Sequence, residues 1–290
     1  IRRLNLSPKS TIVKPEAFLR NRIRSAIQGE PVLLSLFELA RKKGDRVYLV
    51  GGTLRDLALG RRPGDWDLVA DRPWEFATAA ADALGRKVIS LGKEALPTYR
   101  IPLPQSHLDV VGLEAEGLEA DLRRRDFTIN ALAYDPEDDW LLDPTGGIED
   151  LERKLLRVPD RAAFLSDPLR VVKSFRHMAQ LEGFQLESET RLLLEAARAG
   201  LADVAAERIS HELELLLGAQ NPSAAVREMA ATGVLEVLFP ELMPLKGLSQ
   251  NRYHHTDVLE HSLLALGELD GPPQWLEQCG LSAHEDLDWV

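Results

Sequence analysis

The chain has 290 residues, of which 44% are hydrophobic and 28% are charged, and its formal net charge is −11. This composition is typical of a globular protein, and the length suffices for two or three compact units. No apolar run approaches the roughly 20 residues that span a bilayer, which argues against a membrane protein. The acidic balance is unfavourable for nucleic-acid binding unless basic residues cluster locally.

The ends of the chain and its single cysteine give further expectations. The N-terminus lacks the apolar core of a secretory signal, and Cys279 excludes an internal disulfide, so we expect a cytoplasmic protein. The sequence begins without Met and stops at Trp289-Val290, and we expect it to be a fragment of a longer protein.

The first half of the chain alternates between helical and strand patterns. Helices are predicted at 16–44, 53–59 and 73–84, and strands at 47–50, 66–69, 87–91, 98–103 and 107–111. Residues 127–134 and 140–143 form a further mixed apolar stretch. Gly44 and Gly60 are expected to end helices, and Thr53 to cap one. This alternation up to about residue 157 predicts an α/β domain.

The second half of the chain lacks strand signals from Arg161 onward. Helices are predicted at 167–182, 188–199, 205–218, 222–232 and 255–269, with breaks at Gly183, Gly200 and Asn221-Pro222. We therefore expect an all-α region after the α/β domain.

A glycine turn and two aspartates give the strongest local signal. Gly51-Gly52 follows a predicted strand, where backbone N–H groups can approach a phosphate, and Arg55 can pair with a phosphate or brace the loop. Asp65 and Asp67 are two apart, so a strand projects both to one face. Adjacent carboxylates repel one another unless a cation lies between them, and their oxygens suit Mg²⁺.

Asp109, on the strand predicted at 107–111, is a candidate third carboxylate. Three carboxylates around two Mg²⁺ ions fit in-line phosphoryl transfer, with one metal at the attacking hydroxyl and the other at the leaving pyrophosphate. The alternative is a turn aspartate and an exposed strand residue without a metal.

A second block runs from Asp121 to Tyr134. Its arginines, including Arg124 and Arg125, offer bidentate contacts to phosphate. Asp126 and Asn130 are four apart, so a helical turn would place them together, where they can hydrogen-bond a ribose. The alternative is a helix cap with solvated arginines.

Basic residues crowd this block and the segment after it, while much of the acidic excess lies elsewhere. The sequence thus allows a basic track on an acidic protein, although solvated helix faces would give the same pattern. The members of the track are Arg123, Arg124, Arg125, Arg153, Lys154, Arg157, Arg161, Arg170, Lys173 and Arg176.

These segments together resemble the class II tRNA nucleotidyltransferase and bacterial poly(A) polymerase family, which builds or extends RNA 3′ ends. The resemblance covers about residues 30–265 and keeps the order of the motifs of the family. It rests on 49–56, Asp65-Trp66-Asp67, 124–131, Asp167-Pro168-Leu169-Arg170 and Glu207-Arg208-Ile209.

The resemblance implies an α/β nucleotidyltransferase head with a mixed sheet, followed by a helical neck and body. We expect an N-terminal extension at 1–30, the head at 31–157, the neck at 158–221 and the body at 222–290. It also implies that the enzyme adds C and/or A from CTP and ATP to the 3′ end of tRNA, with two Mg²⁺ as cofactors.

The resemblance further assigns roles to single residues. Asp65 and Asp67 would hold the Mg²⁺ ions, and Asp109 aligns with the third carboxylate. The nucleotide-binding residues would be Gly51, Gly52, Arg55, Arg125, Asp126, Asn130, Asp167 and Arg170. Of these, Asp167 and Arg170 would read the incoming base, three apart on one helix face. Arg124, Lys173, Arg176 and Arg208 are expected to contact RNA.

The chain departs from the pattern of the family at two places. Ser166 precedes Asp167, where the family usually has Glu, so we do not expect the usual bracing of the base reader but still expect the Asp167–Arg170 contact. The stretch between Asp109 and Arg124 is short, as in CC-adding members, so CC addition is one hypothesis, and a subfamily that reaches A addition differently is the other.

The histidines near the C-terminus form a further pattern, with His254, His255 and His261 close together. They resemble the start of a metal-dependent phosphohydrolase (HD) domain, with His261 as first ligand. No full ligand set follows, which favours helix packing and capping.

Three other functions compete with tRNA end addition. One is a poly(A) polymerase, another a small-molecule nucleotidyltransferase of the same fold, and the third a catalytically inactive RNA-binding relative. The retained Asp65, Asp67 and Asp109 argue against the third, and the Asp167–Arg170 segment and the long helical half against the second.

Overall fold

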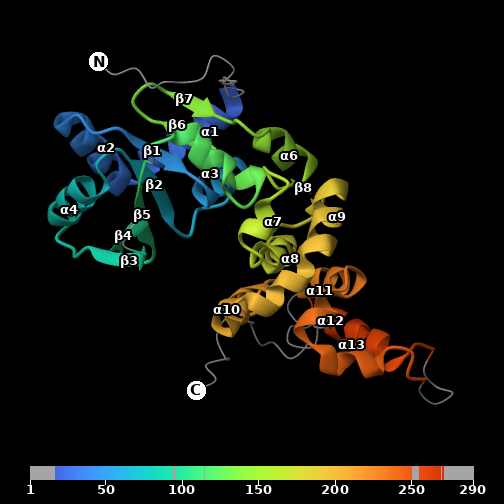
Figure 1. The fold of residues 1–290 in the computed structure, drawn as a ribbon. Helices are drawn as coiled ribbons and strands as arrows, with labels where there is room; N and C mark the ends of the chain where they lie inside the picture. Colours follow the sequence, from blue (N-terminus) through green and yellow to red (C-terminus); the bar gives the residue numbers. More distant parts are fainter. Residues whose placement is uncertain (1–16, 94–95, 114, 250–254, 269, 271–290) are drawn as a thin grey trace, which may run out of the picture. The chain divides into compact units, whose positions relative to one another are not determined.

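The structure, a computed structural model, describes residues 17–93, 96–113, 115–249, 255–268 and 270 (Figure 1). It divides into two compact units. The first takes the described residues up to Arg153 together with Arg157–Asp160, and the second takes Lys154–Leu156 and the described residues from Arg161 onward.

A mixed seven-stranded sheet forms the centre of the first unit. Its order is β3-β4-β5-β2-β1-β6-β7, and β2–β5 is the one parallel pair within this sheet. The strands are β1 (Val47–Val50), β2 (Trp66–Ala70), β3 (Ile89–Lys93), β4 (Leu96–Pro102), β5 (His107–Gly112), β6 (Ala133–Asp135) and β7 (Trp140–Leu142).

The two central strands are apolar because both of their faces are covered. All four residues of β1 are buried, and in β2 the half-buried Asp67 interrupts a buried run. Helix α3 (Gly52–Ala58) follows β1, and α4 (Pro73–Leu84) packs on β2, β4 and β5 (Figure 1). Pro73 at the start of α4 and Gly85 after its end fix the bounds of this helix.

The helix predicted over 16–44 is two helices, α1 (Ala17–Gly29) and α2 (Pro31–Lys43). Glu30 between them is extended, with φ −116° and ψ 91°, because the ring of Pro31 disfavours a helical residue before it. Three short helical elements lie where no helix was predicted. They are α5 (Leu118–Arg123), the 3₁₀ turn η1 (Thr128–Asn130) and α6 (Gly147–Arg153).

The described residues of the second unit form helices, one two-residue strand pair and an isolated bridge between Ser249 and Asp257. β8 (Leu155–Leu156) pairs in parallel with β9 (Gln185–Leu186), which the sequence did not predict. Its helices are α7 (Ala163–Ser166), α8 (Arg170–Gln180), α9 (Ser188–Ala197), η2 (Arg198–Asp203), α10 (Ala206–Leu217), α11 (Pro222–Ala231), α12 (Val234–Leu238), η3 (Pro240–Leu245) and α13 (Val258–Gly267).

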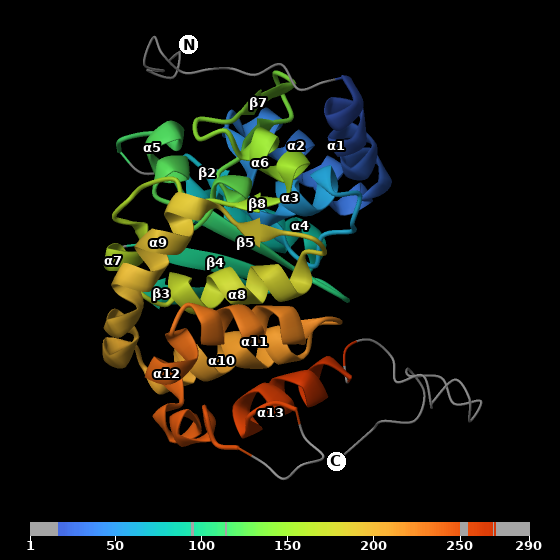
Figure 2. The same ribbon diagram turned by 90° about the vertical axis from the view of Figure 1, so that its right-hand side faces the viewer.

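Helix α8 is the centre of this unit and lies beside α10 and α11 (Figure 2). It buries Val171, Val172 and Phe175, each worth about 1.5–3 kcal/mol of transfer free energy. The α/β unit and the helical unit confirm the predicted fold class. Among the described residues, no helix is long and apolar enough to cross a membrane.

Candidate active site

Asp65 and Asp67 lie at the start of β2, beside the turn that follows β1. Thr53, in the first turn of α3, fixes this arrangement. Its Oγ1 accepts a hydrogen bond from the Asp67 N–H at 2.9 Å and donates to the Asp65 carbonyl at 3.1 Å. Thr53 was predicted to cap α3, but Gly51 occupies the N-cap position, so the hydroxyl is used to hold the two aspartates.

Gly51 allows a close approach between the turn and two charged side chains. Its φ is +71°, a conformation that side chains disfavour. A Cβ atom at this position would lie 2.7 Å from Arg125 Nη1 and 3.2 Å from Asp67 Oδ2. The glycine turn, an arginine and a carboxylate therefore meet at one place, as the sequence led us to expect.

Asp109 lies beside Asp67, since the two residues are directly opposite in the parallel β2–β5 pair. On its other side, β4 places Arg100 opposite Asp109. Arg100 donates from Nε at 2.8 Å and from Nη2 at 2.7 Å to the two oxygens of Asp109. Sequence reasoning did not single out Arg100, although the predicted strands 98–103 and 107–111 would have allowed this cross-strand pair.

His107 is a second neighbour of these carboxylates that sequence reasoning missed. Its Nδ1 is 2.6 Å from Asp65 Oδ1, its Nε2 is 3.6 Å from Asp109 Oδ2, and its backbone N–H donates to Asp65 at 3.2 Å. His107 therefore bridges Asp65 and Asp109.

The electrostatics of the site centre on Asp67. Burial raises the pKa of its carboxyl, Arg125 lowers it, and the charges of Asp109 and Asp65 raise it further. The net pKa is raised, so the ionised carboxylate lacks full compensation from the protein. A group of this kind attracts a cation.

Arg55 is engaged by the protein rather than exposed toward solvent. Its Nε and Nη2 donate to Asp56, and its Nη1 donates to Asn130 Oδ1 at 3.0 Å. Asn130 in turn donates to Asp126 Oδ1 at 2.9 Å, so Asp126 and Asn130 do lie together as predicted. Arg125 Nη2 pairs with Asp121 at 3.1 Å.

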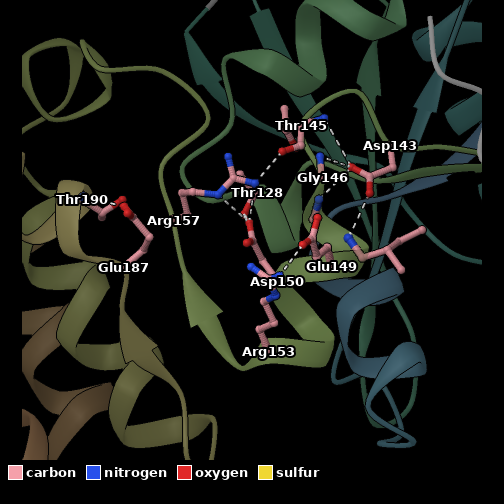
Figure 3. Close-up of polar contacts among 12 residues, drawn as sticks. Thr128, Asp143, Thr145, Gly146, Glu149, Asp150, Arg153, Arg157, Glu187 and Thr190 are labelled. Carbon is pink, nitrogen blue, oxygen red and sulfur yellow. Dashed lines mark hydrogen bonds and ion pairs between the residues drawn. The ribbon is translucent and has the colours of Figure 1, made fainter.

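A buried network that the sequence did not predict holds η1 in place (Figure 3). Thr128 donates from Oγ1 to Asp150 Oδ2 at 2.5 Å, and its N–H donates to the Arg157 carbonyl at 2.8 Å. Arg157 Nε donates to the same Asp150 oxygen at 2.9 Å. Asn130 sits two residues after Thr128, so this network fixes the residue that contacts Arg55.

The turn before α6 is closed by Asp143. Its carboxylate accepts from the N–H groups of four residues, Thr145, Gly146, Gly147 and Ile148, at 2.8–3.3 Å (Figure 3). The signal for this turn was present in the sequence, since Asp143-Pro144-Thr145-Gly146-Gly147 has the composition of a turn followed by a helix N-terminus.

The candidate base-reading residues lie in the second unit, and their geometry differs from the expectation. Helix α8 begins at Arg170, and Asp167 precedes it with an extended backbone (φ −148°, ψ 95°). The prediction that both lie on one helix face was therefore wrong, because Pro168 follows Asp167 and disfavours helical geometry there. Arg208 Nη2 lies 3.3 Å from both oxygens of Asp167.

The other residues expected to contact RNA have different surroundings. Arg176 is paired with Glu212 at 2.5 Å, with both side chains largely buried, and Arg124 Nη1 lies 3.8 Å from Glu116. Lys173 is half-buried on α8.

The histidine pattern near the C-terminus is only partly described. His254 and Cys279 lie outside the described residues, and His255 and His261 are exposed. Within the described part of the chain, no three Asp, Glu, His or Cys side chains converge as a ready-made metal-ligand set.

Comparison with known proteins gives two family matches. Residues 47–157 match the model described as the poly A polymerase head domain. Residues 183–246 match the probable RNA and SrmB-binding site of polymerase A.

Curated relatives share more than a third of their residues with the chain over the aligned part. The A-adding tRNA nucleotidyltransferase of Deinococcus radiodurans is 37% identical over 229 residues, covering 76% of this chain and 51% of the relative. The multifunctional CCA protein of Xylella fastidiosa is 35% identical, covering 73% and 54%. The chain thus spans about half the length of the curated relatives it matches.

Solved structures with similar folds include CCA-adding enzymes. The Thermotoga maritima CCA-adding enzyme complexed with tRNA superposes with a TM-score of 0.66 and 28% identity, covering 89% of this chain and 68% of that one. A CCA-adding enzyme in complex with ATP gives a TM-score of 0.68 and 27% identity, covering 91% and 70%.

Proposed function

The chain belongs to the class II tRNA nucleotidyltransferase and poly(A) polymerase family, and we propose that it adds C and/or A from CTP and ATP to the 3′ end of tRNA. Relatives are named for A addition and for CCA addition, and solved relatives hold tRNA, ATP or CTP.

The observation that carries the proposal is the state of Asp67. Burial and the neighbouring Asp65 and Asp109 raise the pKa of its carboxyl, yet the described residues give its carboxylate no hydrogen bond. Oxygen ligands with excess negative charge are the donors that Mg²⁺ prefers. The donor set at Asp65 and Asp67 therefore fits the two magnesium ions that the family implies.

Within the described residues, no three Asp, Glu, His or Cys side chains form a complete metal-ligand set. This is consistent with Mg²⁺ sites that take one or two carboxylates and complete their coordination with substrate phosphates and water. Asp65 and Asp67 would hold the ions, which when bound stabilise the attacking 3′ hydroxylate and the leaving pyrophosphate.

The remaining residues of the head would bind the nucleotide. Arg125 presents Nη1 at the Gly51 turn, where it would pair with a phosphate of the nucleotide. Asp126 and Asn130 are held together and would bind the ribose hydroxyls. Arg55 is fixed between Asp56 and Asn130. Its positive charge would attract the triphosphate on this side of the site.

The incoming base would be read by Asp167 and Arg170. A carboxylate accepts from the amino group of cytosine or adenine, and a guanidinium donates to a ring nitrogen of either base and to the carbonyl of cytosine. Arg208, bonded to both oxygens of Asp167, would orient this carboxylate in place of the glutamate that Ser166 replaces. Arg170→Ala should reduce the discrimination between CTP and ATP more than it weakens triphosphate binding.

The test is nucleotide addition to tRNAs that end at the discriminator base, at C and at CC, with sequencing of the products. We expect defined one- to three-nucleotide additions, and loss of addition in Asp65→Ala and Asp67→Ala with the fold retained. Long A tails would support a poly(A) polymerase instead. If labelled CTP or ATP transferred its nucleotide to a small molecule but never to RNA, the proposal would be refuted.

A further inference from the structure

The three carboxylates of the site differ in how many of their oxygens are already bonded. The described residues give the Asp67 carboxylate no hydrogen bond, and Asp65 uses Oδ1 alone, toward His107. Asp109 uses both oxygens in a bidentate pair with Arg100. A metal at the Asp67 carboxylate would therefore compete with no hydrogen bond, whereas at Asp109 it would share the carboxylate with Arg100 and be repelled by the guanidinium charge.

The register of the sheet places Arg100 and Asp109 side by side. Asp109 is directly opposite Arg100 in the antiparallel β4–β5 pair and directly opposite Asp67 in the parallel β2–β5 pair. Arg100, Asp109 and Asp67 thus form a row across one face of three neighbouring strands. Bidentate arginine–carboxylate pairs are stronger and more directional than single ion pairs, so Asp109 fixes the direction of the guanidinium.

Arg100 keeps donor capacity after this pairing. Its Nε and Nη2 face Asp109, and the part of the chain that the structure describes offers no partner to Nη1. The side chain is 36% exposed, whereas that of Asp109 is 15% exposed. A half-exposed guanidinium with a free nitrogen, held beside the candidate metal ligands, matches the chemistry of a phosphate site.

We propose that Arg100 binds a substrate phosphate and that Asp109 is the residue that positions it, rather than a third metal ligand. The inference rests on the proposed function, because it places Arg100 next to a phosphoryl-transfer site. The phosphate belongs to the nucleoside triphosphate or to the RNA backbone, which share this chemistry.

The metal part of the proposal is tested by titrating the chain with Mn²⁺ alone and following free Mn²⁺ by electron paramagnetic resonance. The informative variant is the double change Arg100→Met with Asp109→Asn, which removes one charge of each sign and keeps the net charge. We expect its Mn²⁺ affinity to stay within about threefold of wild type, and that of Asp67→Asn to fall by about tenfold or more.

An affinity of the double variant as low as that of Asp67→Asn would show that Asp109 is a metal ligand and would overturn the inference. An unchanged affinity in Asp67→Asn would instead count against the metal site of the proposed function, so the two failures are distinguishable.

The phosphate part is tested with Arg100→Met and Arg100→Lys in steady-state addition assays. In Arg100→Met, the KM for the substrate whose phosphate Arg100 binds should rise by about tenfold. In Arg100→Lys this KM should rise less, because lysine keeps the positive charge but lacks the planar set of donors. A raised KM for CTP and ATP identifies the triphosphate. A raised KM for tRNA identifies the RNA backbone. In that case the slope of log binding constant against log salt concentration should also decrease by about one, since one fewer phosphate is neutralised. If both KM values stay unchanged in Arg100→Met, the inference fails.

Discussion

Gly147→Ala should destabilise the first unit and disturb the site from a distance, because the N-terminus of α6 packs directly on η1. A Cβ atom at Gly147 would overlap the Thr128 carbonyl, lying 2.8 Å from its carbon and 3.3 Å from the Ile129 nitrogen. Ordinary carbon contacts are about 3.5–4.0 Å, so the two backbones must separate by roughly 1 Å.

The size of the effect follows from what this separation breaks. Overpacking costs about 1–3 kcal/mol, and each hydrogen bond lost adds about 1 kcal/mol. The bonds at risk join Asp143 to Gly147 at 2.8 Å and Thr128 to Asp150 at 2.5 Å. With one of the two bonds lost, we therefore expect a decrease of about 2–4 kcal/mol in the free energy of unfolding.

The assay is urea unfolding of the whole chain, combined with hydrogen exchange at the amides of 127–131 and 147–150. Faster exchange there and a higher KM for CTP and ATP should accompany the lost stability, since Asn130 follows Thr128. Gly29→Ala is the matched control. Gly29 is exposed at the end of α1 with nothing within 4 Å of a Cβ, so its change should stay within about 1 kcal/mol of wild type. A Gly147→Ala chain as stable as the control would refute the reasoning.

Three further predictions concern other charged groups. Asp67→Asn should raise the melting temperature of the metal-free protein at neutral pH while abolishing addition. The raised pKa of Asp67 means that its carboxylate costs stability above the ordinary Asp pKa of about 4, so the gain should vanish in acid; an equal gain at all pH values would contradict this. Arg208→Ala should lower the CTP-versus-ATP selectivity more than tRNA affinity, whereas the reverse would make Arg208 an RNA contact. Glu212→Gln should destabilise the helical unit by about 1–3 kcal/mol in thermal unfolding, since it leaves the largely buried Arg176 without its charged partner; no change would mean that this ion pair contributes nothing to stability.

The parts of the fold that could be predicted are those in which a local pattern decides the structure. The buried strand at 47–50 and the helix at 73–84 carry strong apolar periods and clear end signals, and both agree with the structure. The prediction of a single helix over 16–44 was wrong at Glu30. The apolar period continues across Pro31, but the proline prevents Glu30 from taking helical backbone angles.

The site was predictable where its residues lie close in sequence. Asp65, Asp67 and the Gly51 turn were found by spacing, and Asp126 and Asn130 were expected to lie together. Arg100, His107 and the Thr128–Asp150 contact join residues through strand register and tertiary packing, which no local pattern reports. The same holds for Arg208, which lies 41 residues from its partner Asp167.

The order of the strands has a consequence for how the protein folds. Asp67 and Asp109 become neighbours only when β5 inserts beside β2, and the connection between them includes α4, β3 and β4. By contrast, β4 and β5 form a local hairpin, and contacts between nearby residues form before distant ones. Asp109 would then reach β2 already paired with Arg100. The pairing of β5 with β2 therefore does not bring two uncompensated negative charges, those of Asp67 and Asp109, together.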